Sequence, residues 1–211
     1  TIQERYTIGY SYDMLNKLGP SHEFVLGIRF LLLVLRTQLL AYKTSTKSGL
    51  ENYNGNWDGN FDDTKGNFGS KAVNFYGDPL TETLMIKSLE DIQNHTGLEL
   101  VPTYSFLRLY QEGDTMIKHE DRDSCEISVT ICLGYSDNIW PIYLENRQGE
   151  SIEVPQKPGD ALIYSGCELP HWRNKLKKGH HSQTFIHYNR KNKTNNNFRD
   201  GRPHFGVPKE I

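Results

Sequence analysis

Apolar and polar positions alternate with a period of two over much of the second half of the chain. Between Tyr104 and Tyr110, one face of the predicted strand carries two tyrosines, Phe106 and Arg108, and the opposite face carries a serine and two leucines. Similar short segments follow at 127–133, 142–145, 151–154, 161–164 and 183–189. Many short strands separated by turn residues predict a core of β-sheet, arranged as a sandwich or an open barrel.

Helical patterns precede these strands. Asp78 and Pro79 combine an N-cap residue with a proline at the first helical position, and Gly97 suits the cap at the other end. An apolar segment that begins near Ser21 and runs to about residue 43 predicts an earlier helix. Its longest unbroken apolar run, 30–35, is far short of the about 20 residues that cross a bilayer. The sequence therefore predicts an α+β fold with no membrane segment.

Two stretches lack periodicity. Residues 48–78 are rich in asparagine, glycine and aspartate, which predicts a long loop, and we interpret this loop as a candidate lid. Residues 191–211 contain few apolar side chains and predict a solvated C-terminal extension. The whole chain, 1–211, is predicted to be one domain, with helical support in 1–98 and the strand core in 99–190.

Composition narrows the classes of partner. The 24 basic and 26 acidic residues give a net charge of −2, which argues against general attraction to nucleic acid or membranes. A basic stretch from Arg173 to Arg202 keeps nucleic-acid modification open as an alternative. The odd number of cysteines (Cys125, Cys132 and Cys167) shows no zinc-type spacing and is typical of a reduced, cytoplasmic compartment. The sequence carries no signal for oligomeric state.

A short motif offers metal ligands. His119 and Asp121 are two positions apart, so on an extended segment both side chains project to the same side. His171 is the candidate third ligand, supplied from much later in the chain. Two imidazoles and one carboxylate on one face of an octahedral iron(II) leave three positions for a cosubstrate and dioxygen. The tripeptide alone is common, so its surroundings decide its meaning.

A longer pattern surrounds this tripeptide. It comprises the runs YSFLRLY (104–110), GD (113–114), HEDR (119–122), SCEISVT (124–130), PGDALIY (158–164), GCEL (166–169), HWR (171–173) and FIHY (185–188). In order and spacing the pattern resembles iron(II)- and 2-oxoglutarate-dependent oxygenases, in a bacterial and phage branch distantly similar to prolyl 4-hydroxylases. The resemblance covers roughly residues 75 to 190. It implies a double-stranded β-helix (jelly-roll) core flanked by N-terminal helices, with the site near its mouth.

The resemblance also implies a reaction and its cofactors. His119, Asp121 and His171 would hold Fe(II), and 2-oxoglutarate and O2 would be consumed as a substrate is hydroxylated. By analogy alone, the leading substrate class is a protein or peptide residue such as proline, and a small molecule is the other choice. A non-catalytic cupin-like protein that binds zinc through the same three residues is an alternative, because zinc needs no open positions.

The distal carboxylate of 2-oxoglutarate needs a cation. In prolyl hydroxylase relatives a lysine or arginine lies ten residues after the distal histidine, where this chain has His181, with Gln183 one side-chain repeat further. A neutral imidazole is a poor substitute for a guanidinium that pairs with a carboxylate through two hydrogen bonds. We therefore predict Arg173 as the partner, with Arg108 as second choice and Tyr110 as a hydroxyl donor to the same ligand.

Other polar residues have simpler interpretations. His180 and His181 follow two lysines and are predicted to be solvated. His187 is predicted to be a histidine of the core or rim with its hydrogen bonds satisfied. Arg122 is either a group that orients the carboxylate of Asp121 or a charge on the rim.

Overall fold

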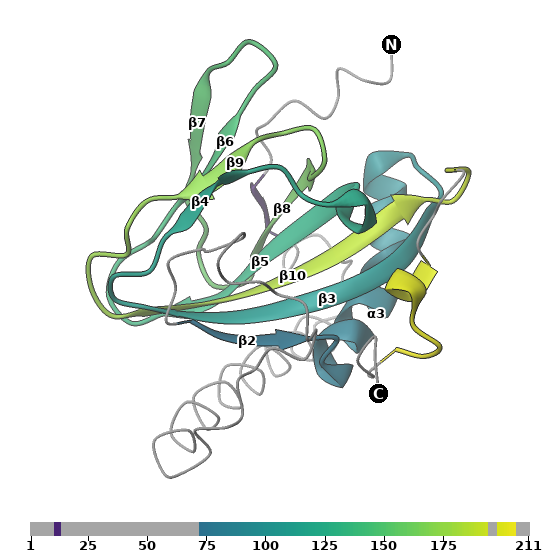
Figure 1. Cartoon of the computed structure of the whole chain (residues 1–211), viewed down its shortest axis with the longest axis horizontal. Helices are drawn as coiled ribbons and strands as arrows, with labels where there is room; N and C mark the ends of the chain where they lie inside the picture. The colour runs from purple at the N-terminus through teal and green to yellow at the C-terminus, as the bar shows by residue number, and fades with distance from the viewer. Residues whose placement is uncertain (1–10, 14–71, 194–197, 206–211) are drawn as a thin grey trace.

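The computed structural model describes residues 11–13, 72–193 and 198–205 (Figure 1). The predicted helix at 21–43, most of the predicted loop at 48–78 and the last residues of the C-terminal extension lie outside the described residues. In the described part, no helix is long and apolar enough to cross a membrane.

The strands form two antiparallel sheets (Figure 1). The larger sheet has the order β1-β8-β5-β10-β3-β2, and the smaller has the order β4-β9-β6-β7. The strand bounds are β1 Ser11–Asp13, β2 Val73–Tyr76, β3 Leu100–Gln111, β4 Met116–His119, β5 Ile127–Tyr135, β6 Ile142–Glu145, β7 Ser151–Val154, β8 Asp160–Ser165, β9 His171–Arg173 and β10 His180–Arg190. Mostly antiparallel sheet with one α-helix among the described residues agrees with the predicted α+β class and with a jelly roll.

Helix α3, Pro79–Thr96, has the predicted ends. The carboxylate of Asp78 accepts hydrogen bonds from the amides of Leu80 and Thr81, and Gly97 ends the helix in the left-handed conformation with φ of 71°. One face of α3 packs on the larger sheet (Figure 1), where its apolar side chains join those of β3, β5 and β10 in the main core. The helix therefore covers the outer face of that sheet.

The two faces of β3 have different surroundings. Leu107 and Leu109 point to the helix side and belong to the main core. The alternate residues of β3, from Tyr104 to Tyr110, point to the other side and line a cavity between the strands. The predicted alternation in this segment is confirmed, and it places the functional residues on the face opposite the helix.

Most predicted elements are confirmed with small shifts of their ends, but two expectations are wrong. The end of the predicted loop forms strand β2, which pairs with β3 because 73–76 is a run of residues suited to strands. Part of the predicted solvated extension is buried, since Asp200 is 3% exposed and Arg202 is 4% exposed. Both arginine and aspartate there are neutralised by partners, so their polarity does not keep them at the surface.

Candidate metal centre and its cavity

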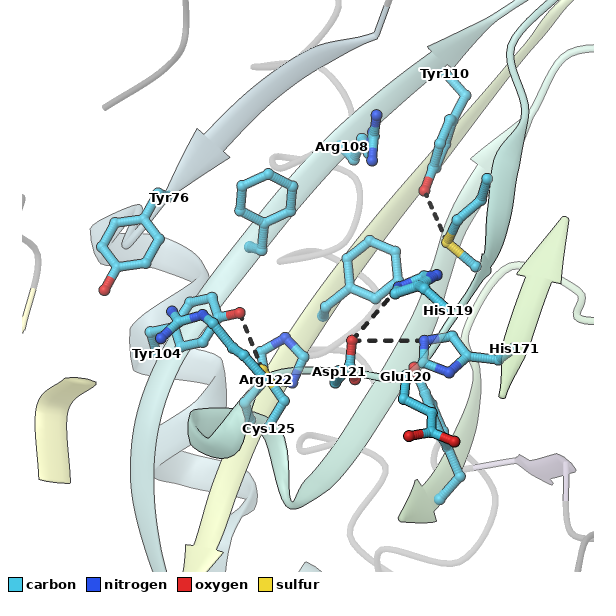
Figure 2. A pocket seen from close by; sticks show the side chains of 15 residues that line it. Tyr76, Tyr104, Arg108, Tyr110, His119, Glu120, Asp121, Arg122, Cys125 and His171 are labelled. Atoms are coloured by element: carbon cyan, nitrogen blue, oxygen red, sulfur yellow. Dashed lines mark hydrogen bonds and ion pairs between the residues drawn. The ribbon is translucent and has the colours of Figure 1, made fainter. Parts of the chain in front are cut away.

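The three predicted ligands come together at the smaller sheet. His119 ends β4, His171 begins β9, and the two residues are direct cross-strand partners in the antiparallel pairing. Asp121 follows two residues after β4, and its Oδ1 lies 3.6 Å from Nε2 of each histidine. In Figure 2, dashed lines join the carboxylate of Asp121 to both imidazole rings, which lie next to each other on one side of it. Donor atoms at this separation can all reach one ion placed about 2.0–2.2 Å from each.

Hydrogen bonds to backbone carbonyls fix the orientation of both histidine rings. Nδ1 of His119 lies 2.8 Å from the carbonyl of Ile117, and Nδ1 of His171 lies 2.9 Å from the carbonyl of Leu169. A carbonyl oxygen only accepts, so each Nδ1 carries the proton and donates it. Each ring is therefore oriented with its Nε2 toward Oδ1 of Asp121, so Nε2 is the atom that each histidine would offer to an ion.

Asp121 is held on two sides. Its amide donates to the carbonyl of Gly166, 2.9 Å away, and its Oδ2 accepts a hydrogen bond from Ser128 Oγ at 2.8 Å. Burial alone would raise the pKa of this carboxyl group, but the imidazoles of His119 and His171 outweigh burial and hold the pKa well below its ordinary value. The carboxylate is therefore charged and has one oxygen, Oδ1, facing the histidines.

Gly166 lies against this carboxylate without room for a side chain. A Cβ built on Gly166 would stand 2.4 Å from Asp121 Oδ2, 2.5 Å from Ser128 Oγ and 2.4 Å from the carbonyl of Cys125. Real Cβ atoms essentially never approach other atoms this closely. Glycine at this position is what allows the turn after β8 to pack directly on Asp121.

A cavity of about 200 Å³ opens beside the three ligands. Its wall includes the candidate ligands, the inward residues of β3, and Tyr76, Met116, Glu120, Arg122, Cys125, Tyr164, Phe185 and His187. Figure 2 shows Arg108 and Tyr110 toward one end of this space, and Tyr104, Arg122 and Cys125 gathered at the other. The cavity therefore has the candidate ligands on one wall and two chemically different ends.

One end of the cavity is a stack of rings. Tyr104 stacks on Tyr76 with ring centroids 5.0 Å apart and packs at a tilt against His187 at 4.6 Å. The guanidinium of Arg122 lies 4.4 Å from the centre of the Tyr104 ring. The hydroxyl of Tyr104 lies 3.1 Å from Cys125 Sγ. Burial raises the pKa of both Tyr104 and Cys125, so both stay neutral.

Arg122 is neutralised by the C-terminal segment, which we define as residues 198–205. Its two terminal nitrogens donate to the two carboxylate oxygens of Asp200, each at 2.7 Å. Ser124 and Tyr76 also donate to Asp200 through their hydroxyl groups. Burial would raise the pKa of Asp200, but the hydrogen bonds and charge of Arg122 lower it to about 2. Arg122 is therefore an exposed charge at the rim of the cavity, where it packs on Tyr104 as part of an ion pair with Asp200.

A second group of potential ligands shares Asp121. Ligand atoms of Asp121, Cys125 and His187 all lie within 4.8 Å of one another. Nδ1 of His187 is 3.0 Å from Ser128 Oγ, so Ser128 connects the histidine to the carboxylate. Asp121 and His187 of this second group are therefore already joined by hydrogen bonds through Ser128, whereas Cys125 Sγ contacts the hydroxyl of Tyr104.

The residues predicted for the 2-oxoglutarate carboxylate fall into two places. Arg108 and Tyr110 line the cavity. Arg173 does not line it but is the cross-strand partner of Met116, which does. His181 and Gln183 lie in the same buried polar group as Arg173, since Gln183 donates to Gln156 at 3.2 Å and Arg173 donates to the same oxygen at 3.2 Å.

His181 is not solvated as expected, because it is completely buried. Its Nε2 lies 2.7 Å from Oε1 of Gln183, and its ring packs between Tyr135 and Trp140. Burial and the nearby charge of Arg173 lower its pKa to about 3, so the ring is neutral. The two preceding lysines misled the interpretation, because strand β10 begins at His180 and turns His181 inward.

Comparison with known proteins gives structural matches only. No protein-family model matches the sequence, and a search of curated proteins finds no match. A prolyl-4-hydroxylase from Pseudomonas putida matches with a TM-score of 0.47 and 15% identity, covering 57% of this chain and 72% of that one. HygX from Streptomyces hygroscopicus, solved with nickel and 2-oxoglutarate, matches with a TM-score of 0.47 and 13% identity over 58% of this chain and 71% of that one.

A prolyl hydroxylase from Trichoplax adhaerens, solved with a peptide fragment of the hypoxia inducible factor, gives a TM-score of 0.47 and 14% identity. This match covers 56% of this chain and 63% of that one. At such scores the likeness carries no functional argument, which rests instead on the geometry of the site. The chain is similar in structure to prolyl hydroxylases and other 2-oxoglutarate- and iron(II)-dependent oxygenases, the group that its sequence resembles.

Proposed function

We propose that this chain is an iron(II)- and 2-oxoglutarate-dependent oxygenase that hydroxylates an organic substrate in the cavity beside His119, Asp121 and His171. The observation that carries the proposal is the convergence of two imidazole nitrogens on one carboxylate oxygen at the wall of a cavity. Two nitrogens and one oxygen on one side of an ion suit iron(II) with open positions. We also infer that the two sheets wind as a double-stranded β-helix.

The chain's own residues would hold the ion and orient the substrate, and they would not react themselves. When bound, iron(II), 2-oxoglutarate and dioxygen supply the oxidation, which places one oxygen atom in a substrate C–H bond and yields succinate and carbon dioxide. His119 and His171 would hold the ion through Nε2, since the Nδ1 of each ring donates to a backbone carbonyl. The ring stack at Tyr104 gives an uncharged wall for the substrate, since Arg122 is neutralised by Asp200. Such a wall suits an apolar side chain, and we propose a peptide residue such as proline.

For the distal carboxylate of 2-oxoglutarate we propose Arg173. Its guanidinium is 1% exposed, and its partners are the carbonyl of Trp140 and the amide oxygen of Gln156. Within the described residues no carboxylate pairs with it, its Nε has no hydrogen-bond partner, and burial lowers its pKa. A buried cation that has only neutral partners is stabilised when a carboxylate enters and pairs with it. Met116, a flexible side chain that lines the cavity and is the cross-strand partner of Arg173, would move aside.

Succinate formation from 2-oxoglutarate tests the reaction. Purified chain with iron(II), 2-oxoglutarate and air should form succinate slowly even without its substrate, and Asp121→Ala and His171→Ala should abolish this turnover and leave the fold intact. His204→Ala removes an exposed histidine far from the ligand set in sequence and serves as control. Full activity in Asp121→Ala would disprove the proposal. Retention of zinc with no succinate would instead favour the cupin-like alternative.

The 2-oxoglutarate partner is tested by its Michaelis constant. Arg173→Met should raise the KM for 2-oxoglutarate by roughly 100-fold or more, since hydrogen-bonded charge pairs contribute about 2–5 kcal/mol. Arg108→Met is the matched variant because Arg108 lines the cavity directly. A large rise in KM for Arg108→Met and none for Arg173→Met would transfer the role to Arg108.

A further inference from the structure

We propose that Ser128 and His187 are positioning residues that fix Asp121 as a ligand through one oxygen. The inference rests on the proposed function, because it assumes that Asp121 binds the metal. Ser128 Oγ lies 2.8 Å from Asp121 Oδ2 and 3.0 Å from Nδ1 of His187. Ser128 projects from β5 and His187 from β10, and the two residues are direct cross-strand partners. We call the chain of hydrogen bonds from His187 through Ser128 to Asp121 the relay. It runs from the larger sheet to the proposed ligand beside the smaller sheet.

Counting protons fixes the direction of both hydrogen bonds. The geometry of their contact has Ser128 donating its single hydroxyl proton to Oδ2 of Asp121. The carbonyl of Cys125, 3.2 Å from the same hydroxyl, is also only an acceptor. The contact with His187 therefore requires the histidine to donate, with its proton on Nδ1. The alternative, in which Ser128 donates to His187, would leave Oδ2 facing a lone pair.

Packing holds the imidazole ring of His187 in the orientation that this hydrogen bond needs. It is 4% exposed, and its ring packs on Tyr104 with centroids 4.6 Å apart. Ser128 is 1% exposed, and the phenol of Tyr164 also lies beside its hydroxyl. A buried serine that is itself anchored by a donor keeps its proton aimed at the carboxylate.

The consequence for the metal is a defined coordination number. With Oδ2 occupied by Ser128, only Oδ1 is directed at the two histidine nitrogens. Without the serine, the carboxylate is free to rotate and offer both oxygens, which removes one of the open positions that the reaction needs. Groups that hold ligands in this way typically change metal affinity by about 10–100-fold when mutated.

Binding of Mn²⁺ alone, followed by electron paramagnetic resonance, tests the relay without any turnover. Ser128→Ala should raise the Kd for Mn²⁺ by about 10–100-fold relative to the unmodified chain. Ser105→Ala is the matched control, since Ser105 is equally buried and its hydroxyl bonds Thr81 on the helix side of β3. A Kd for Ser128→Ala within twofold of the unmodified chain would overturn the inference while leaving the metal site in place.

A pair of variants separates the donor role of His187 from its volume. Asn carries an amide nitrogen near the position of Nδ1, and Leu has a similar size without a donor. His187→Asn should therefore keep Mn²⁺ affinity near that of the unmodified chain, and His187→Leu should weaken it about as much as Ser128→Ala. Equal affinities for the Asn and Leu variants would count against the relay.

The tautomer of His187 gives an independent readout without metal. Long-range proton–nitrogen correlation spectra should show the His187 proton on Nδ1, and a proton on Nε2 alone would overturn the inference. Should the unmodified chain bind no Mn²⁺, the proposed function fails, and the relay as a ligand-positioning device fails with it. Mn²⁺ binding in the unmodified chain with equal binding in Ser128→Ala rejects the relay alone.

Discussion

Gly166 is the residue at which the metal site is most sensitive to a single added carbon. Its backbone conformation is one that any residue adopts, so nothing about strain demands glycine there. The demand is steric, because Asp121, Ser128 and the carbonyl of Cys125 fill the space of a Cβ. The carbonyl of Cys125 is a backbone atom and the carboxylate of Asp121 is a proposed ligand, so a shift of either would disturb the proposed metal site.

Gly166→Ala should therefore weaken metal binding more than it weakens the fold. We expect a loss of Mn²⁺ affinity of at least about 10-fold, because the methyl group displaces Asp121 from the histidines. Gly149→Ala is the contrasting variant: its φ of 80° strains an alanine, but no atom lies within 4 Å of the added carbon. It should lower stability by about 1 kcal/mol and leave Mn²⁺ affinity unchanged. Equal Mn²⁺ affinity in both variants would contradict the steric argument.

His181 makes the stability of the chain depend on pH. Burial, with a contribution from the charge of Arg173, lowers its folded-state pKa to about 3 from an ordinary value of 6.5. Below about pH 6.5 the unfolded chain takes up a proton that the folded chain refuses, so the free energy of unfolding falls as the pH falls. The expected slope from this residue is about 1.4 kcal/mol per pH unit down to about pH 3.

Urea unfolding of His181→Gln at several pH values measures this contribution. Glutamine keeps a donor for Gln183 but does not titrate, so the variant should lose about 2 kcal/mol less stability than the unmodified chain between about pH 7 and pH 5. Other histidines titrate equally in both proteins and cancel in the difference. Parallel stability curves would show that His181 is protonated as readily in the folded state as in the unfolded state.

At the scale of elements, the C-terminal segment holds several elements together through ion pairs and hydrogen bonds. Asp200 has a φ of 55° and joins Arg122, next to a candidate ligand, to Tyr76 on β2. Two residues later Arg202 forms a buried ion pair with Glu82 of α3 and donates to the carbonyl of Thr103 on β3. The segment therefore connects the helix, the larger sheet and the loop of the metal ligands.

Asp200→Asn should destabilise the chain by about 1.5–3 kcal/mol, because it removes the charge that Arg122 pairs with. Asparagine tolerates the left-handed conformation as aspartate does, so the variant isolates the charge. Glu99→Gln removes the acid of an exposed pair, in which Lys191 lies 3.9 Å away, and should change thermal unfolding very little. Similar effects of the two substitutions would contradict a stabilising role for the ion pair between Asp200 and Arg122.

Which elements could be predicted depends on whether their signal is local. Helix α3 was predictable because its caps, Asp78 and Gly97, are adjacent to it in sequence. The long strands β3, β5 and β10 were predictable from alternation over many positions. Strands β4 and β9, which carry the two histidines, are too short to show a period.

The site was predictable in its ligand set as a hypothesis, but not in the residues that support it. His119, Asp121 and His171 belong to a recognisable pattern, and the structure brings them together. Ser128 and Asp200 act on Asp121 and Arg122 through folding alone, from positions with no spacing signal. The burial of His181 could not be predicted, because two lysines lie shortly before it in the sequence, at 177 and 178, while its neighbours in space are aromatic rings.

At the scale of the whole molecule, a bound ion should stabilise the fold by mass action. Mn²⁺ at about 100 times its Kd should add about 2.7 kcal/mol, since the three ligands are assembled only in the folded chain. For a chain of this size the expected rise in Tm is about 5–10 °C. His171→Ala should show no such rise. Equal Tm shifts in the two proteins would mean that the ion binds elsewhere.

The pairing of His119 with His171 across β4 and β9 sets their separation by strand register, not by the length of chain between them. That intervening chain includes the turn between Glu145 and Ser151, where the residues are mostly exposed and Asn146 closes the loop with Glu150. A peptide tag or a small folded insert at this turn would lengthen the connection without moving either imidazole. The turn is therefore a natural place to attach a reporter while keeping the proposed ligand set in register.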